Sequence, residues 1–231
     1  MPAHTGYFTL LASQLVGPTG RVVAIEPSPA FHQTLTANIE ANGCANVRTV
    51  NAAVSDAVGR KTFYLERSTN LGGTTSVLPR TVVSSFEADA APLPQLVTED
   101  ELAAACLIKI DVEGGEAAAV RGLAPVLGRL RHDAELVIEV TPRTLAKQGQ
   151  QVDDVLAPLR EHGFHVYRLA NDYSAASYPA ALRRPAPAVR WHGSITEMSD
   201  PVFSRTDAET LPPLIGRVRR STARLRGPWA V

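Results

Sequence analysis

Short apolar segments that alternate with helical segments constrain this chain more than any other feature. Segments 21–25, 107–112 and 135–140 are largely apolar and rich in valine and isoleucine, which is typical of strands buried in a parallel sheet. Helical spacing of apolar residues appears between them, for example over 6–15 and 116–123. This alternation predicts an α/β fold, a Rossmann-like, doubly wound and mostly parallel sheet with helices on both faces.

The same pattern continues along most of the chain. Further strands are expected over 47–54, 61–65, 166–169 and 189–195, and further helices over 28–41 and 152–162. Segment 70–96 lacks periodicity and is predicted to be a long surface loop. We expect one domain over 1–204, incomplete at its N-terminus, and a basic, solvated tail over 205–231.

Composition excludes several classes of partner. Lysine plus arginine equals aspartate plus glutamate at 23 each, so no global field steers the chain onto nucleic acid or an anionic membrane. We therefore expect a small-molecule substrate, and the homo-oligomeric state is left open. The two cysteines, Cys44 and Cys106, form no disulfide framework, and together with the lack of a long apolar run this predicts a cytoplasmic protein.

Carboxylates end the three most apolar segments. Glu26, Asp111 and Glu139 each follow such a segment, and ligands of open parallel sheets bind beyond the carboxyl ends of the strands. Glu26 is placed to accept hydrogen bonds from ribose hydroxyls, or else is a solvated acid near a helix start. NAD-binding Rossmann domains use an acid at this place too, but their glycine fingerprint is absent, since Gly17 and Gly20 follow a helix.

The acids around Asp111 allow several kinds of chemistry. Glycines follow Asp111 and Glu113 directly and would let backbone approach a ligand closely, while Glu116 is expected to cap the next helix. General base, acceptor of a substrate hydroxyl and metal ligand all remain open for Asp111 and Glu139. His192 could serve as a base, although a single histidine in a strand is more often structural.

Taken together, these motifs resemble the FkbM-type methyltransferases. The matching segments are 6–10 (GYFTL), 20–29 (GRVVAIEPSP), 51–56 (NAAVSD), 107–116 (LIKIDVEGGE) and 135–140 (ELVIEV). The resemblance spans roughly 5–170 and is most specific at the IKIDVEG phrase. It implies a class I methyltransferase fold, S-adenosylmethionine as methyl donor, and O-methylation of a hydroxyl on a sugar or secondary metabolite.

The resemblance also implies roles for individual residues. Gly6 would end the glycine-rich cofactor loop, and Glu26 would hold the ribose hydroxyls. Asn51, Ala52 and Ala53 would border the adenine.

The reacting centre is implied at the end of the 107–112 strand. Asp111 would lie near the methionine end of the cofactor, and Asp111 or Glu139 would take the proton of the acceptor hydroxyl. Metal-assisted O-methylation with these two acids as oxygen ligands for magnesium or calcium is a further possibility.

One family feature has no counterpart in the sequence. Family members carry an apolar strand just before the Gly6 segment, and here only residues 1–5 precede it. We therefore expect the first strand of the sheet to be missing, its two neighbours to expose their edges, and the chain to be a fragment or to have a misplaced start. Two rival functions follow, a non-catalytic remnant of the same fold and an NAD-dependent Rossmann oxidoreductase.

Overall fold

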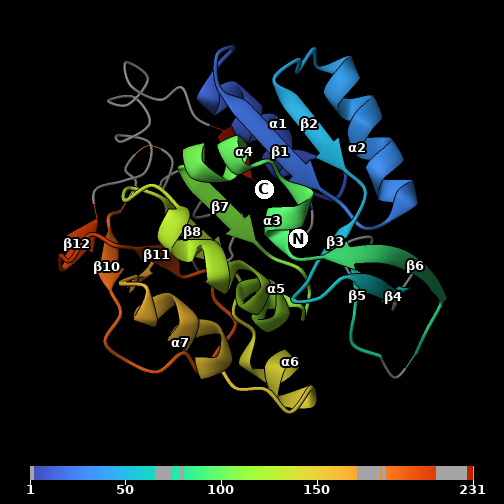
Figure 1. Cartoon of the computed structure of the whole chain (residues 1–231). Coiled ribbons are helices and arrows are strands. Elements are labelled where there is room, and N and C mark those ends of the chain that lie inside the picture. The colour runs from blue at the N-terminus through green and yellow to red at the C-terminus, as the bar shows by residue number, and fades with distance from the viewer. Residues whose placement is uncertain are drawn as a thin grey trace.

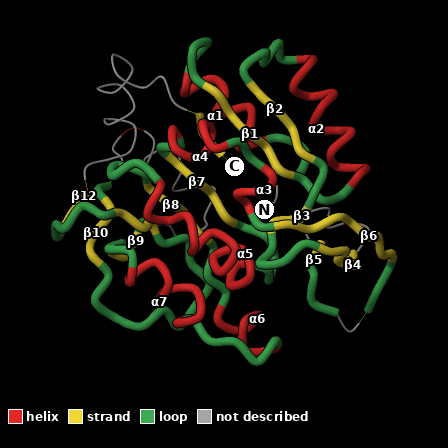
Figure 2. The backbone as a smooth tube through the Cα atoms, viewed as in Figure 1, coloured by secondary structure: helices red, strands yellow, loops and turns green. Residues whose placement is uncertain are grey.

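A sheet of nine strands forms the centre of the protein (Figures 1 and 2). The computed structural model describes residues 3–65, 74–78, 81–170, 183, 186–211 and 228–230. The strand order is β12-β10-β9-β11-β8-β7-β13-β1-β2. The strands are β1 (Arg21–Ile25), β2 (Val47–Val50), β7 (Leu107–Ile110), β8 (Glu135–Ile138), β9 (His165–Arg168), β10 (Ala188–Arg190), β11 (Val202–Ser204), β12 (Thr210–Leu211) and β13 (Pro228–Ala230).

The half of the sheet from β8 to β2 is parallel, and the half from β12 to β11 is antiparallel. The predicted α/β fold with a doubly wound sheet is therefore confirmed, with a mixed rather than wholly parallel edge. The strand predicted over 189–195 is shorter, since β10 ends at Arg190, and β11 was not predicted at all. β11 is only three residues long, which is too short for a periodic pattern to mark it.

Helices cover both faces of the sheet, because successive apolar side chains of β1 point to opposite faces and both must be buried. Val23 and Ile25 point to the face covered by α3 (Leu93–Leu96), α4 (Glu99–Ala104), α5 (Glu116–Leu123), α7 (Asp153–Glu161) and the 3-10 helix η1 (Ala124–Arg129). Val22 and Ala24 point to the opposite face, where α1 (Tyr7–Val16) and α2 (Pro29–Ala41) pack. Burial on both faces explains why the parallel strands are continuously apolar.

A second, smaller sheet stands beside the carboxyl ends of the main one (Figure 1). Its order is β3-β6-β4-β5, formed by β3 (Ala53–Val54), β4 (Gly59–Leu65), β5 (Thr74–Thr75) and β6 (Ser84–Ala91). The strand predicted over 47–54 is thus wrong as one element, because it divides into β2 in the main sheet and β3 in the small one.

The loop predicted over 70–96 is also wrong for the part of it that the structure describes. It contains β5, β6 and α3, and β6 pairs antiparallel with β4 along its whole length. The segment of β6 is SSFEADAA, in which Phe86, Ala88 and Ala90 alternate with two acids, but alanine and acidic residues are depleted in strands, so the pattern is a weak signal. Pairing with β4 and the stacking of Phe86 on Phe63, with ring centroids 5.3 Å apart, define this strand instead.

The position of the expected missing strand is occupied. β13 lies between β1 and β7, parallel to both, with Val22 opposite Trp229 and Ile108 opposite Ala230. Further along β1, the Ala3 amide donates to the Ile25 carbonyl at 3.1 Å. The expectation that both edges would be exposed is therefore wrong, and so is a solvated tail for 228–230. Strand pairing satisfies backbone groups whatever the side chains are, so apolar patterning does not reveal this strand.

Among the described residues, no helix is long and apolar enough to cross a membrane. The predicted solvated tail is also wrong for Thr210 and Leu211, which form β12 in the main sheet with Leu211 2% exposed. Residues 212–227 and 231 of that tail lie outside the described part.

Candidate functional site

The carboxyl ends of β1, β7 and β8 meet at one edge of the sheet, because these strands are parallel. Glu26, Asp111 and Glu139 each follow one of them directly. Two turns lie at this edge as well, one before α1 and one between β7 and α5. The residues nominated from the strand ends are therefore on the same side of the molecule.

Glu26 is a buried carboxylate held by backbone amides. Its side chain belongs to a residue only 1% exposed, and its two oxygens accept from the amides of Ser28 at 2.8 Å and His4 at 2.7 Å. Burial raises the pKa of Glu26 to about 7, although these two hydrogen bonds lower it. Each carboxylate oxygen has a second lone pair, so Glu26 keeps the capacity to accept from ligand hydroxyls.

Gly6 forms the turn that leads into α1. Its φ of +101° is a conformation that side chains rarely adopt, and a Cβ placed there would lie 2.8 Å from Leu35 Cδ1. The neighbouring Thr5 carbonyl accepts from Asn38 Nδ2 at 2.7 Å, which ties this turn to α2. The turn is therefore held close to the sheet, beside Glu26, where glycine alone fits without strain.

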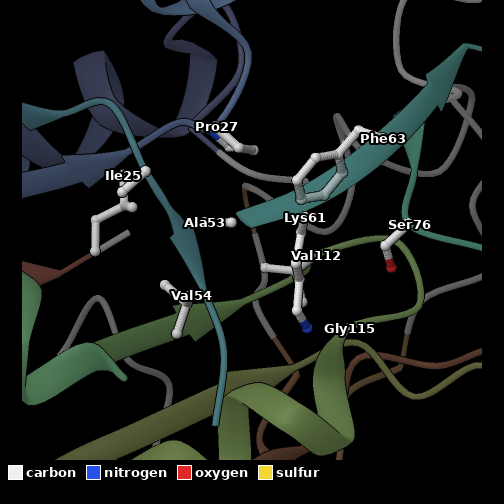
Figure 3. Close-up of a pocket in the computed structure, with 10 residues that line it drawn as sticks. Ile25, Pro27, Ala53, Val54, Lys61, Phe63, Ser76, Val112 and Gly115 are labelled. Atoms are coloured by element: carbon white, nitrogen blue, oxygen red, sulfur yellow. The ribbon is translucent and has the colours of Figure 1, made fainter. Parts of the chain in front are cut away.

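An apolar pocket lies between the end of β1 and the small sheet (Figure 3). Its lining residues are Ile25, Pro27, Ala52, Ala53, Val54, Lys61, Phe63, Ser76, Val112 and Gly115. Ala52 and Ala53, which the family resemblance nominated, are thus in the pocket wall. Asn51 is not, because its Nδ2 donates to the carbonyls of Glu26 at 2.8 Å and Pro27 at 3.2 Å.

The turn after β7 is fixed by several hydrogen bonds. Glu116 accepts from the amides of Val112 and Gly114, each at 3.1 Å, and so holds the turn before α5. The expectation that it caps α5 is wrong, because the N-cap position is Gly115 and no side chain caps this helix. Gln148 Nε2 donates to the Gly114 carbonyl at 2.6 Å. Gly114 has a φ of +101° and Glu113 one of +52°, which is unusual for a residue with a side chain. Such strain at the end of a strand is often found where a ligand binds.

Three carboxylates converge beyond β7 and β8. One oxygen each of Asp111, Glu139 and Asp200 lies within 4.8 Å of the other two, and we call these residues the acid cluster. Glu139 Oε1 also accepts from Thr141 Oγ1 at 2.9 Å. An oxygen-rich group of this kind could hold magnesium or calcium. Sequence reasoning missed Asp200, which precedes β11 and reaches the cluster because β11 pairs antiparallel with β8.

A lysine accompanies the acid cluster. Lys109 Nζ lies 2.6 Å from Asp111 Oδ2 and 4.8 Å from the centroid of the Phe8 ring. Burial lowers the pKa of Lys109, and the charges of Asp200, Glu139 and Glu113 oppose that effect. Lys109 is part of the IKIDVEG phrase, but the sequence analysis assigned it no role. A lysine inside an apolar strand segment could have identified it, because a buried charge needs a partner.

Glu113 is a further acid of this edge that sequence reasoning left without a role. Burial raises its pKa to about 7, and the negative charge of Glu139 adds to the shift. A carboxyl group that titrates near neutral pH can exchange a proton with a substrate under ordinary conditions. Glu113 is therefore a second candidate for proton transfer beside Asp111.

His192 makes its contact with a surface acid. It is exposed, and its Nε2 is 3.2 Å from a carboxylate oxygen of Glu209. The surface pair with Glu209 accounts for this histidine and supports the structural alternative over a role as base.

The model of the methyltransferase FkbM domain matches residues 1–166. A search of the curated proteins finds no match to this chain. Among solved structures, a methyltransferase FkbM from Methylobacillus flagellatus KT is 17% identical with a TM-score of 0.44, covering 87% of this chain and 41% of that protein. A precorrin-6y C5,15-methyltransferase from Geobacter metallireducens GS-15 is also 17% identical, with a TM-score of 0.39, covering 88% of this chain and 73% of that protein.

Proposed function

Because the chain belongs to the FkbM methyltransferase family, we propose that it transfers a methyl group from S-adenosylmethionine to a hydroxyl group of a sugar or secondary metabolite. The observation that carries the proposal is the shared sheet edge. A buried acid with an adjoining apolar pocket follows β1, and an acid cluster follows β7 and β8. The first arrangement suits a nucleoside, and the second suits a group that must lose a proton.

The residues beyond β1 fit the adenosine part of the donor. Glu26 can accept from both ribose hydroxyls, and charge-assisted hydrogen bonds of this kind contribute about 1.5–3 kcal/mol each. Ala52, Ala53 and Phe63 offer apolar walls for a planar base. Gly6 lets the backbone of the turn before α1 approach the ligand closely.

The residues beyond β7 fit the methyl acceptor. Asp111 is a buried carboxylate that can take the proton of a hydroxyl as its oxygen attacks the methyl carbon. Glu139 can perform the same task, since it belongs to the same acid cluster. Bound S-adenosylmethionine supplies the methyl group and a positive sulfonium, which the nearby carboxylates favour. Positioning of the two reactants accounts for most of the rate enhancement in such in-line transfers.

The acceptor in this proposal is a small molecule that carries a hydroxyl group. The formal net charge of zero gives no support to nucleic acid as the methyl acceptor. The proposed catalytic unit extends beyond the domain expected over 1–204, because β13 lies between β1 and β7 in the sheet that carries the site.

Calorimetric titration with S-adenosylhomocysteine and, separately, with NAD tests the proposal. We expect binding of S-adenosylhomocysteine with a stoichiometry of one and no binding of NAD. Glu26→Gln should weaken that binding, whereas Glu40→Gln on the exposed surface of α2 should not. Binding of NAD alone would establish the oxidoreductase alternative, and binding of neither compound would establish a non-catalytic remnant.

The acid cluster raises a second variant of this function for testing, metal-assisted O-methylation. Asp111, Glu139 and Asp200 offer three of the six to eight oxygen ligands that magnesium or calcium takes. A methyl-transfer assay with a panel of sugar and polyketide hydroxyls, run with and without a chelator, separates the two variants. Loss of turnover in the chelator, restored by magnesium, would identify the metal-assisted reaction.

A further inference from the structure

Lys109 is a buried cation beside the acid cluster. Its side chain is 14% exposed and that of Asp111 is 9% exposed, with Nζ 2.6 Å from Oδ2. The two residues are separated by one position along an extended segment, so their side chains project from the same face. The geometry of β7 therefore fixes this ion pair, without requiring a flexible surface lysine to find its partner.

A second contact holds the ammonium group in place. Lys109 Nζ lies 4.8 Å from the centroid of the Phe8 ring, a distance at which a cation is attracted to the face of an aromatic ring. Phe8 belongs to the first turn of α1, two residues after Gly6. Lys109 thus connects the turn on the cofactor side of the site with the acid on the acceptor side.

The acid cluster needs positive charge. Carboxylates whose oxygens lie within 4.8 Å of one another repel, and a cation beside them offsets this repulsion. A divalent cation or a nearby ammonium group would each supply that positive charge.

Lys109 meets the requirement and also disfavours a metal. Its ammonium group already bonds one of the Asp111 oxygens that a metal would use. A magnesium or calcium ion needs six or more oxygen ligands, and a fixed positive charge beside the cluster repels it.

We propose that Lys109 takes the place of a divalent cation in the acid cluster. It is a positioning residue that holds the Asp111 carboxylate in place and offsets the repulsion among the three acids, so that methyl transfer proceeds without a metal. This inference rests on the proposed function, because it assigns the proton transfer to Asp111. It goes further because it identifies the Lys109 ammonium as the group that offsets the negative charge of the acid cluster, and because it makes this a metal-independent methyltransferase.

The test compares metal binding and kinetics in four forms of the full chain. These are the wild type, Lys109→Met, Lys109→Arg and the control Lys147→Met, which removes an exposed lysine of α6 (Pro142–Lys147). Mn²⁺ binding is measured by electron paramagnetic resonance, cofactor affinity by titration with S-adenosylhomocysteine, and kcat and KM with and without a chelator.

We expect the wild type and Lys147→Met to bind no stoichiometric Mn²⁺ and to ignore the chelator. Lys109→Met should lower kcat by about 10- to 100-fold, as loss of a group that supports a catalytic ligand typically does. Its affinity for S-adenosylhomocysteine should be unchanged, it should bind Mn²⁺, and added Mn²⁺ should restore part of the turnover. Lys109→Arg should keep most of the activity, since the positive charge remains.

Two outcomes would overturn the inference. One is stoichiometric Mn²⁺ binding by the wild type together with loss of turnover in the chelator, which needs no variant to fold. The other is an unchanged kcat in Lys109→Met. If the wild type neither binds S-adenosylhomocysteine nor transfers methyl groups, the proposed function fails, while the Mn²⁺ titrations still decide whether Lys109 or a metal balances the acid cluster.

Discussion

The ends of β1 and β7 present the same motif in two different electrostatic settings. Each strand is followed by a buried acid, and each acid lies near a glycine with a φ of +101°. At β1, Glu26 is held by two backbone amides, and burial raises its pKa to about 7 although these hydrogen bonds lower it. At β7, Asp111 is held by the ammonium group of Lys109.

The difference indicates a division of labour along one edge of the sheet. Neutral amide donors orient a carboxylate without cancelling its charge, which suits the binding of hydroxyl groups. A direct ion pair fixes the position of a carboxylate, which suits a group that must meet the acceptor hydroxyl in one geometry. Substitutions at the β1 end should therefore change affinity, and those at the β7 end should change turnover.

Replacement of Asp111 has the largest expected effect. Asp111→Asn keeps the shape but cannot take a proton, so kcat should fall by about 10²- to 10⁴-fold, the usual contribution of a general base. Affinity for S-adenosylhomocysteine should stay within a few-fold, as measured by calorimetry. Asp133→Asn, at a surface acid paired with Arg131, is the control and should behave as wild type. Full turnover in Asp111→Asn would transfer the role of base to Glu139 or Glu113.

Replacement of Glu26 should affect the affinity for the cofactor and leave kcat unchanged. Glu26→Gln loses the charge of its hydrogen bonds to ribose, and the dissociation constant for S-adenosylhomocysteine should rise about 10- to 100-fold. At saturating cofactor, kcat should remain close to that of the wild type. A fall in kcat with unchanged affinity would contradict the division of labour between the two strand ends.

The two strand-end glycines should cost similar stability and differ in function. Alanine at Gly6 or Gly114 must adopt a positive φ, at a cost of about 1–2 kcal/mol. Gly6→Ala should weaken cofactor binding, whereas Gly114→Ala should mainly reduce kcat. Gly128→Ala is the control, since a Cβ there meets no atom within 4 Å. Thermal melting and calorimetry check the set, and equal functional losses in both variants would argue against separate roles.

The smallest expected effect is the pH dependence that Glu26 gives to stability. Its pKa is raised from 4.5 to about 7 in the folded protein. The associated stability is present below the unfolded pKa and is lost as pH rises through 7. Between pH 8 and pH 6 the wild type should therefore gain on the order of 1 kcal/mol relative to Glu26→Gln, or roughly 2–4 °C in Tm. The same change of Tm with pH in both proteins would show that Glu26 is not buried as described.

Periodicity predicted the elements whose burial is uniform along the chain. The strand over 21–25 and the helix over 116–123 have the predicted bounds, because each packs on continuous apolar neighbours. β6 was missed because its alternating positions hold mainly alanine and acids, which have low strand propensity, and pairing with β4 defines the strand. β13 was missed because it is recruited from the far end of the chain.

The residues of the candidate site also fall into two groups, those that the sequence could identify and those that depend on tertiary contacts. Glu26, Asp111 and Glu139 could be found from the sequence, since the carboxyl ends of parallel strands meet at one edge. Asp200 could not, because it follows an unpatterned region and reaches the acid cluster only through the antiparallel pairing of β11 with β8. Asn51 was nominated for the adenine but supports the turn after β1, a contact that depends on side-chain direction.

The sequence by itself determined the fold class, the family and the set of acids at the strand ends, because period, order and strand ends are local properties of the chain. The tertiary structure decided which segment lies between β1 and β7, which acids form one cluster, and that Lys109 contacts both Asp111 and Phe8. These are contacts between residues distant in sequence or between particular side chains, and they depend on how the packed elements bring charges together in space.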